Sequence, residues 1–197
     1  MKRKQGYCAA AVWACLGLVA GLGVDRAGAD MSSTDLRIAD EALVIPNTRV
    51  TSSEGRHAAL RSLLPQDDAV ILSFTFTGCA SICDITNAIL LGVEDELTRV
   101  EATSEVQIAT LSIDPWNDTP EALALEKEKL GAQWLWLTGG PRGTQPILDA
   151  LRFPPGAISE HDPMFLIGRP CSGRMTRVIG LANPEDLVAL ARGLDAC

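Results

Sequence analysis

The sequence has little positive charge and very little histidine. Its 197 residues include 17 lysines and arginines against 25 aspartates and glutamates, so the formal net charge is −8 at pH 7. A protein this acidic lacks the basic surface that binds nucleic-acid phosphates, which argues against a nucleic-acid-binding function. The two histidines are His57 and His161. Because His57 lies in a polar stretch among arginine and serine, we interpret it as a surface residue and not as a metal ligand.

The sequence also lacks a complete phosphate-binding loop and internal repeats. The glycine-rich stretch 139–143, GGPRG, is not followed by the Lys and Ser/Thr that end a phosphate-binding loop, so we interpret it as a turn. No low-complexity tract is present. The length is sufficient for one domain with a well-buried core, and the sequence gives no sign of a second core.

The first 29 residues have the composition of a secretory signal. Three basic residues at positions 2–4 precede the uncharged stretch 6–24, and the small residues 27–29, Ala-Gly-Ala, suit a cleavage site. An uncleaved membrane anchor is the alternative, because the uncharged stretch is barely long enough to span a bilayer. Cleavage would leave a net charge of −11. We therefore expect export, to the periplasm or the outer face of the inner membrane.

After this segment the sequence predicts a short lead-in and one folded domain. Residues 30–40 are polar and mixed, which indicates a flexible lead-in, and residues 41–197 form the domain. The stretch 41–51, EALVIPNTRVT, combines β propensity with a turn at Pro46-Asn47. This pattern predicts a small N-terminal β-hairpin.

The stretch 69–91, AVILSFTFTGCASICDITNAILL, is the centre of the predicted fold. Its apolar start, rich in β-branched and aromatic residues, is typical of a strand buried on both faces. Its end has apolar residues at helical spacing. Cys79 and Cys83 therefore lie at or near a helix N-terminus, where the macrodipole favours thiolate over thiol. About one helical turn apart, the two sulfurs can form a disulfide or hold a soft metal ion.

Strands and helices alternate along the rest of the chain. A threonine cap at Thr119, followed by proline, and Gly131 at the other end mark one helix. That helix is predicted at 120–130, and two further helices are predicted at 145–151 and 185–191. Further strands are predicted at 106–113, 134–137, 164–168 and 175–180. This order predicts a thioredoxin-like α/β fold, a central mixed β-sheet flanked by helices with an N-terminal hairpin. In that fold a dithiol at the start of the first long helix is the expected active site.

His161 is the residue that could complete a metal site with the two cysteines. It precedes a predicted central strand, and we expect its loop to face Cys79 and Cys83. Two sulfurs and one imidazole suit copper, whereas a closed zinc site requires four ligands. Two alternatives remain open. His161 could be an ordinary surface-loop residue, and the cysteine pair could be a structural disulfide, although so short a closed loop stabilises little.

The other late sulfur-containing residues have structural interpretations. Cys171 and Cys197 are expected to form a disulfide between the late hairpin and the C-terminus, worth about 3 kcal/mol, with an exposed free Cys197 as the alternative. Met164 and Met175 fall in apolar strand patterns. We interpret both methionines as core residues and not as copper ligands.

Several stretches, in the right order, resemble the Sco/SenC family of copper chaperones. Residues 74–83, FTFTGCASIC, resemble the family signature F-x-x-T-x-C-x-x-x-C-P up to its last position. Residues 112–115, SIDP, and 118–121, DTPE, are similar to its second block, and 137–139 match its Leu-Thr-Gly. The stretch 161–168 resembles the family's histidine loop and following strand.

The resemblance, which extends from about residue 45 to 191, implies an extracytoplasmic thioredoxin-fold protein. It implies that Cys79, Cys83 and His161 bind Cu(I) or Cu(II). It further implies a metallochaperone that delivers copper to, or reduces the cysteines of, the binuclear copper centre of cytochrome c oxidase. The expected partner is a copper-receiving protein such as the oxidase copper subunit. We expect a monomer, associated with a membrane only through an uncleaved N-terminal segment.

Two positions depart from the family pattern. Asp84 stands where the family usually has proline, and this extra carboxylate favours the helix but opposes thiolate formation nearby. Glu160 precedes His161 where aspartate is common.

Two other functions stay open. One is a metal-independent thiol–disulfide oxidoreductase, or a peroxide-reducing protein, in which Cys79 and Cys83 are the redox dithiol. The other is an interaction domain with a vestigial site. Whether the protein is an enzyme also stays open, and we interpret it as a chaperone.

Overall fold

A computed structural model describes residues 36–79, 82–103, 105–156 and 162–197. The chain divides into two units, Met1–Ser32 and Ser33–Cys197. The predicted signal segment and His161 both lie outside the described residues, so these predictions stay untested. Within the described ranges, no helix has both the length and the hydrophobicity that a membrane span requires.

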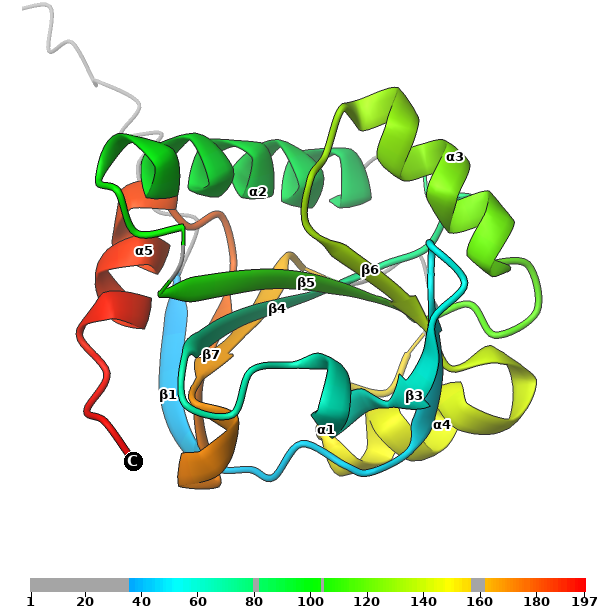
Figure 1. Cartoon of the computed structure of the whole chain (residues 1–197), viewed down its shortest axis with the longest axis horizontal. Coiled ribbons are helices and arrows are strands. Elements are labelled where there is room, and N and C mark those ends of the chain that lie inside the picture. Colours follow the sequence, from blue (N-terminus) through cyan, green and yellow to red (C-terminus); the bar gives the residue numbers. More distant parts are fainter. Residues whose placement is uncertain (1–35, 80–81, 104, 157–161) are drawn as a thin grey trace, which may run out of the picture. The chain divides into compact units, whose positions relative to one another are not determined.

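The described chain forms one mixed sheet with an uninterrupted order of strands (Figure 1). Strand β4 lies near its middle, parallel to β5 and antiparallel to β7. Across the sheet the order is β1 (Arg37–Ala42), β8 (Arg174–Ile179), β7 (Met164–Gly168), β4 (Ala69–Thr75), β5 (Val106–Ser112), β6 (Leu135–Thr138), β2 (Arg49–Ser52) and β3 (His57–Ala59).

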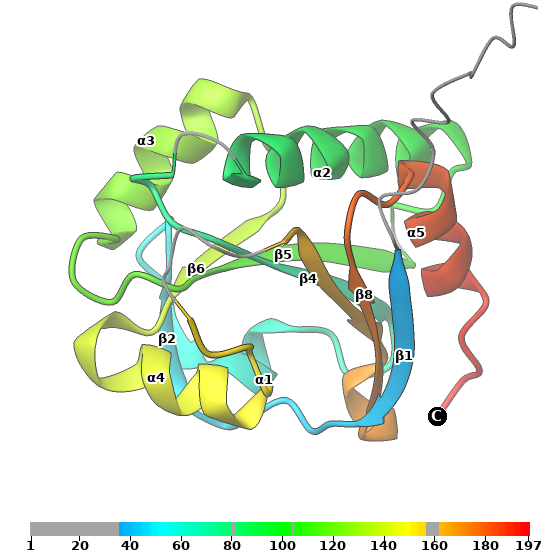
Figure 2. The same cartoon turned by 180° about the vertical axis from the view of Figure 1, so that it is seen from behind.

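Helices cover both faces of the sheet (Figures 1 and 2). One face carries α2 (Ile82–Arg99), α3 (Pro120–Leu130) and α5 (Pro184–Arg192). The other face carries the short α1 (Leu60–Leu63) and α4 (Gly140–Ala150), and a 3₁₀ turn, Pro170–Ser172, joins β7 to β8. The predicted mixed sheet flanked by helices is confirmed.

Strand β4 is buried along its whole length, as its apolar sequence predicts. All seven of its residues are buried. Val70, Leu72 and Phe74 contribute to the core beneath α1 and α4, whereas Ile71 packs in the core beneath α2 and α5. Because side chains alternate along a strand, only a strand covered on both faces buries consecutive side chains.

The predicted ends of α3 are also present. The Thr119 side chain accepts a hydrogen bond from the backbone N–H of Ala122 at 3.2 Å. Gly131 ends the helix in the left-handed region, with φ of 70°, where a residue without Cβ is least strained.

The prediction for the N-terminal part of the domain is wrong in two respects. Residues 37–40, expected in the flexible lead-in, belong to β1, which pairs antiparallel with β8. The expected hairpin of 41–51 does not form, because β1 and β2 lie far apart in the strand order. An N-terminal hairpin does exist, but it joins β2 to β3. The glycine-rich stretch after β6 is also not only a turn, because Gly140–Gly143 begin α4.

Candidate functional site

Cys79 and Cys83 lie where the chain passes from the carboxyl end of β4 into α2. Their sulfurs form a disulfide, and the two Cα atoms are 5.8 Å apart. Cys79 is half-buried, and Cys83, the second residue of α2, is buried. Cys83 lies in α2, which packs by its apolar face, whereas Cys79 lies in the segment between the buried strand β4 and α2. The structure brings together the dithiol that the sequence predicts.

One backbone N–H group is directed at the Cys79 sulfur. The Cys83 N–H donates to Cys79 Sγ at 3.2 Å. This N–H belongs to the first turn of α2, where backbone donors have no acceptor within the helix. The Cys79 N–H itself donates to the Phe76 carbonyl at 3.2 Å, which closes a tight turn. A donor directed at the sulfur, together with the helix dipole, favours negative charge there after reduction.

The turn before Cys79 is fastened to a distant part of the chain. The Asp118 carboxylate accepts hydrogen bonds from the Thr77 backbone N–H at 3.0 Å and from the Thr77 hydroxyl at 2.6 Å. It also accepts one from the Ser112 hydroxyl at 2.6 Å. The segment between β5 and α3 is thereby joined to the cysteine turn.

An apolar pocket adjoins Cys83 and reaches the described residue nearest to His161. The pocket is lined by Phe74, Phe76, Ile82, Cys83, Thr86, Ile113, Phe153, Asp162, Pro163 and Met164. Asp162 directly follows His161 in the sequence, so the chain on that side of position 161 lies beside the dithiol. The position of the imidazole itself stays a prediction.

The described residues alone do not form a complete metal site. They contain no group of three or more His, Cys, Asp and Glu side chains that could hold a metal ion. Cys79 and Cys83 would provide two soft ligands on reduction, which suits Cu(I). His161 stays the predicted third ligand, and the residue that follows it, Asp162, lines the pocket beside Cys83.

The two late methionines are core residues, as expected. Met164 and Met175 are 5% and 2% exposed. The Arg177 guanidinium donates to Met164 Sδ at 2.9 Å, so that sulfur already has a cationic partner. An ideal Cβ on Gly168 would meet Met175 Sδ, which shows how closely this methionine packs against β7.

An ion pair that the sequence does not predict lies next to Met164 of the pocket. Arg177 donates from Nε and Nη2 to the two oxygens of Glu41, at 2.7 and 2.9 Å, and from Nη2 to the Leu151 carbonyl at 2.9 Å. The hydrogen bond from Arg177 holds the pKa of Glu41 below its usual value of 4.5, against a smaller opposing effect of burial. No local signal could have revealed this pair, because it joins residues 136 positions apart.

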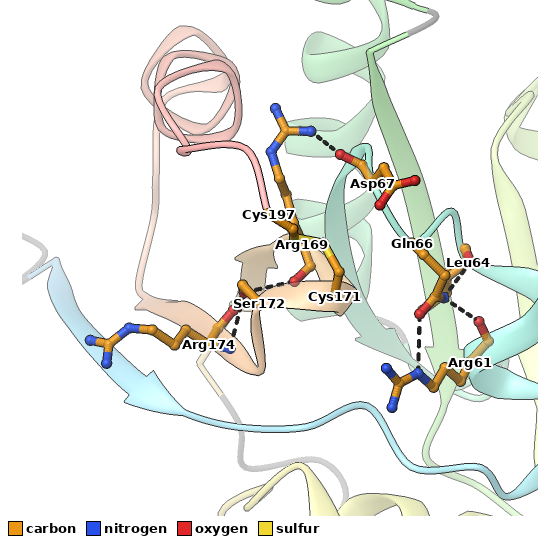
Figure 3. The surroundings of a disulfide bond; sticks show 9 residues. All are labelled: Arg61, Leu64, Gln66, Asp67, Arg169, Cys171, Ser172, Arg174 and Cys197. Atoms are coloured by element: carbon orange, nitrogen blue, oxygen red, sulfur yellow. Dashed lines mark hydrogen bonds between the residues drawn. A yellow bond between two sulfur atoms is a disulfide. The ribbon is translucent and has the colours of Figure 1, made fainter.

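The second predicted disulfide, Cys171–Cys197, is present (Figure 3). It lies beyond the carboxyl end of β7, which pairs with the amino-terminal half of β4. The Cys171 N–H donates to the Gln66 carbonyl at 3.1 Å, and Arg169 donates to the Asp67 carbonyl. This disulfide is therefore at the opposite end of β4 from Cys79.

The chain is similar to known proteins in sequence pattern and in fold. Residues 50–156, more than half of the chain, match the family model described as SCO1/SenC. A comparison with curated protein sequences gives no match.

Three solved structures illustrate the similarity of fold. ScoI of Arabidopsis thaliana, solved with copper bound, has a TM-score of 0.62 and 18% identity, with 74% of this chain and 94% of that chain covered. BsSco, a member of the Sco family of cytochrome c oxidase assembly proteins, has a TM-score of 0.62 and 21% identity, with 76% of this chain and 92% of that chain covered. A SCO1/SenC family lipoprotein from Bacillus anthracis str. Ames has a TM-score of 0.64 and 16% identity, with 78% of this chain and 95% of that chain covered.

These structural similarities confirm the predicted thioredoxin-like α/β fold. The family model spans the cysteine turn, β5 and α3, so it includes the dithiol and the Asp118 contact. From the sequence match over more than half its length, together with this fold, the chain belongs to the SCO1/SenC family.

Proposed function

We propose that this protein is an exported copper-binding metallochaperone that delivers copper to, or reduces the cysteines of, the copper centre of a respiratory oxidase. The observation that carries the proposal is the pair of adjacent sulfurs, Cys79 and Cys83, beside a pocket that reaches Asp162. Family membership supports it, as does the copper bound in the Arabidopsis relative.

In this proposal the copper ion is a cargo held by Cys79, Cys83 and His161. Two thiolates and an imidazole form a three-coordinate site that suits Cu(I) and leaves one side open to a recipient. The same two sulfurs form the disulfide, so copper binding first requires its reduction by two electrons and two protons. Copper loading and disulfide formation therefore exclude one another at this site.

Copper titration of the reduced protein tests the assignment. We expect one Cu(I) per chain, and His161→Ala should weaken binding by tenfold or more, about 1.4 kcal/mol. Cys79→Ala and Cys83→Ala should abolish it. His57→Ala is the matched control, because His57 lies in β3 with its Nδ1 2.8 Å from the Thr51 hydroxyl, and it should bind copper normally. Unchanged affinity in His161→Ala would contradict the proposal.

A thiol–disulfide oxidoreductase is the second candidate. The observation that favours it is the disulfide itself, together with the half-buried Cys79, which is more accessible than Cys83. A partner thiolate would attack Cys79 and release the Cys83 thiolate. Under this function the His161→Ala variant would reduce a disulfide substrate, or oxidise a dithiol substrate, as fast as the wild type without copper.

The location and the partner are also proposals. The basic, apolar and small-residue pattern of residues 1–29 supports export. The Bacillus anthracis relative is a lipoprotein, which is compatible with a protein attached outside the cytoplasm. We expect a monomer that meets the copper subunit of an oxidase in the periplasm or at the outer face of the inner membrane. Copper transfer to that purified subunit domain would test the partner.

A further inference from the structure

The Asp118 carboxylate is buried beside the cysteine turn. It is 2% exposed, and its oxygens accept three hydrogen bonds from Thr77 and Ser112 at 2.6 to 3.0 Å. None of the ion pairs between described residues includes Asp118. A buried carboxylate is costly unless several donors satisfy it, so these contacts determine where its neighbours can lie.

Helix capping does not explain Asp118. The N-cap residue of α3 is Thr119, whose own side chain accepts from the Ala122 N–H. The Asp118 side chain instead points to a segment 41 residues earlier in the chain. Two of its donors, a backbone N–H and a hydroxyl, belong to Thr77, which precedes Cys79 by two residues.

The geometry makes the position of Cys79 depend on this contact. Thr77 gives both its backbone N–H and its hydroxyl to Asp118. The next contact along the turn joins the Cys79 N–H to the Phe76 carbonyl. With Phe76 continuing from β4 and Thr77 fastened to Asp118, Cys79 has little freedom to move away from Cys83.

We propose that Asp118 is a positioning residue that holds Cys79 against Cys83 through Thr77 and so stabilises the disulfide relative to the dithiol. The inference deepens the proposed function, and it rests on Cys79 and Cys83 being the functional pair. A released turn lowers the effective concentration of one thiol at the other, which disfavours closure of the bond. A contact that stabilised both redox forms equally would leave their ratio unchanged.

Equilibration of the full chain in glutathione buffers tests the inference. The reaction is Cys79–Cys83 disulfide plus two glutathione thiols, giving two protein thiols plus one glutathione disulfide. Differential alkylation and mass spectrometry of the Cys79–Cys83 peptide measure the ratio separately from the other cysteines. We expect Thr77→Val, which removes the hydroxyl donor, to lower the equilibrium constant for disulfide formation about tenfold, which is about 30 mV.

Three further variants make the result specific. Thr77→Ser keeps the hydroxyl and should restore the wild-type ratio, and Asp118→Asn should shift it in the same direction as Thr77→Val. Thr98→Val removes a hydroxyl that donates to the Glu94 carbonyl in the last turns of α2, and it should have no effect. If Asp118→Asn does not fold, the two Thr77 variants still decide the question.

Two outcomes would overturn the inference: a Thr77→Val ratio equal to that of the wild type, or a Thr77→Ser ratio equal to that of Thr77→Val. The measurement contains no copper, so it is independent of the metallochaperone proposal. A protein that binds no copper but shows the Thr77→Val shift would disprove that proposal and leave this inference standing.

Discussion

Asp84 follows Cys83 directly and is exposed in the first turn of α2. A carboxylate at this position has two opposite effects. It interacts favourably with the positive end of the helix dipole, and it repels negative charge that forms on the neighbouring sulfurs. Asp84 therefore stabilises α2 and at the same time makes thiolate formation at the neighbouring cysteines less favourable.

The variant Asp84→Asn should separate these two effects. We expect the reduced protein to be alkylated about two- to threefold faster at Cys79, since the repulsion corresponds to about 0.5 kcal/mol at an exposed helix terminus. The free energy of unfolding should fall by a similar amount. Iodoacetamide kinetics and urea denaturation measure the two quantities.

Asp95→Asn is the control for Asp84→Asn, because it removes an exposed carboxylate from the same helix three turns further on. It should leave the alkylation rate unchanged. The rate difference should shrink at high salt, where exposed charges are screened. Slower alkylation of Asp84→Asn would contradict the repulsion argument.

The sequence predicts the two cysteines of the site but not what fixes them. The positions of Cys79 and Cys83 can be predicted because the two residues follow an apolar strand and lie at the start of a helical pattern. The Asp118 contact crosses 41 residues, and the DTPE stretch predicts only a helix cap when it is read locally. His161 stays a prediction that depends on the resemblance and on the position of Asp162.

At the scale of elements, β1 is attached to the sheet edge by more than its backbone. It pairs with β8, and Glu41 of β1 forms the two-contact ion pair with Arg177 of β8. The Arg177 side chain is 8% exposed and that of Glu41 21% exposed, so water screens the pair only in part. Removing one partner leaves a mostly buried charge without compensation.

Glu41→Gln should lower the free energy of unfolding at pH 7 by about 2 kcal/mol, because charged hydrogen bonds are lost. The pKa of Glu41 is held below its usual 4.5 in the folded protein, chiefly by the hydrogen bond from Arg177. The stabilising contribution of the ionised Glu41 is therefore complete above pH 4.5. It declines as the pH falls below 4.5 towards the lower pKa of the folded protein. Urea denaturation at pH 7 and in the acidic range measures both.

The difference between wild type and Glu41→Gln should accordingly decrease in acid. Asp40→Asn serves as the matched variant, since Asp40 is exposed on the same strand and accepts a hydrogen bond from the Thr176 hydroxyl at 2.6 Å. Asp40→Asn should lower the free energy of unfolding at pH 7 by less than Glu41→Gln does. An equal loss in the two variants would mean that the Arg177 pair has no special contribution.

Elements with a regular apolar pattern are predicted well, and those held by distant contacts are not. Strands β5 and β7 lie within one residue of the predicted ranges, 106–113 and 164–168, and β4 begins at residue 69, where the predicted buried strand begins. Burial on both faces makes these strands rich in apolar residues. Strand β1, RIADEA, has one large apolar residue, Ile38, and it is 53% exposed. Pairing with β8 and the Glu41–Arg177 contact make it a strand, and neither is visible locally.

At the scale of the whole molecule, the two disulfides have different loop sizes. Cys171 and Cys197 are separated by 26 positions, and Cys79 and Cys83 by 4. A disulfide restricts the unfolded chain more when it closes a longer loop. The Cys171–Cys197 bond is therefore the structural one, because it joins the C-terminus to the turn between β7 and β8.

The double variant Cys171→Ser/Cys197→Ser should lower the free energy of unfolding by about 3 kcal/mol, because its unfolded chain is no longer restricted. Cys79→Ser/Cys83→Ser should lower it less, since its loop is short. Denaturation of the oxidised proteins in urea measures both losses. A larger loss from Cys79→Ser/Cys83→Ser would contradict the interpretation of Cys171–Cys197 as the structural bond and Cys79–Cys83 as the functional bond.

The seven residues of β4 hold these two bonds apart by about 20 Å, with one beyond each end of the strand. Because the Cys171–Cys197 bond closes the longer loop and stabilises the fold more, an electron-counting titration should proceed in two stages, with two electrons entering at Cys79–Cys83 under a mild reductant and two more at Cys171–Cys197 only under a stronger one. After the first stage Cys79 and Cys83 should be a reduced dithiol, while the Cys171–Cys197 bond still joins the C-terminus to the turn between β7 and β8. Repeated reduction and oxidation of the Cys79–Cys83 pair should then leave the bond that stabilises the fold intact.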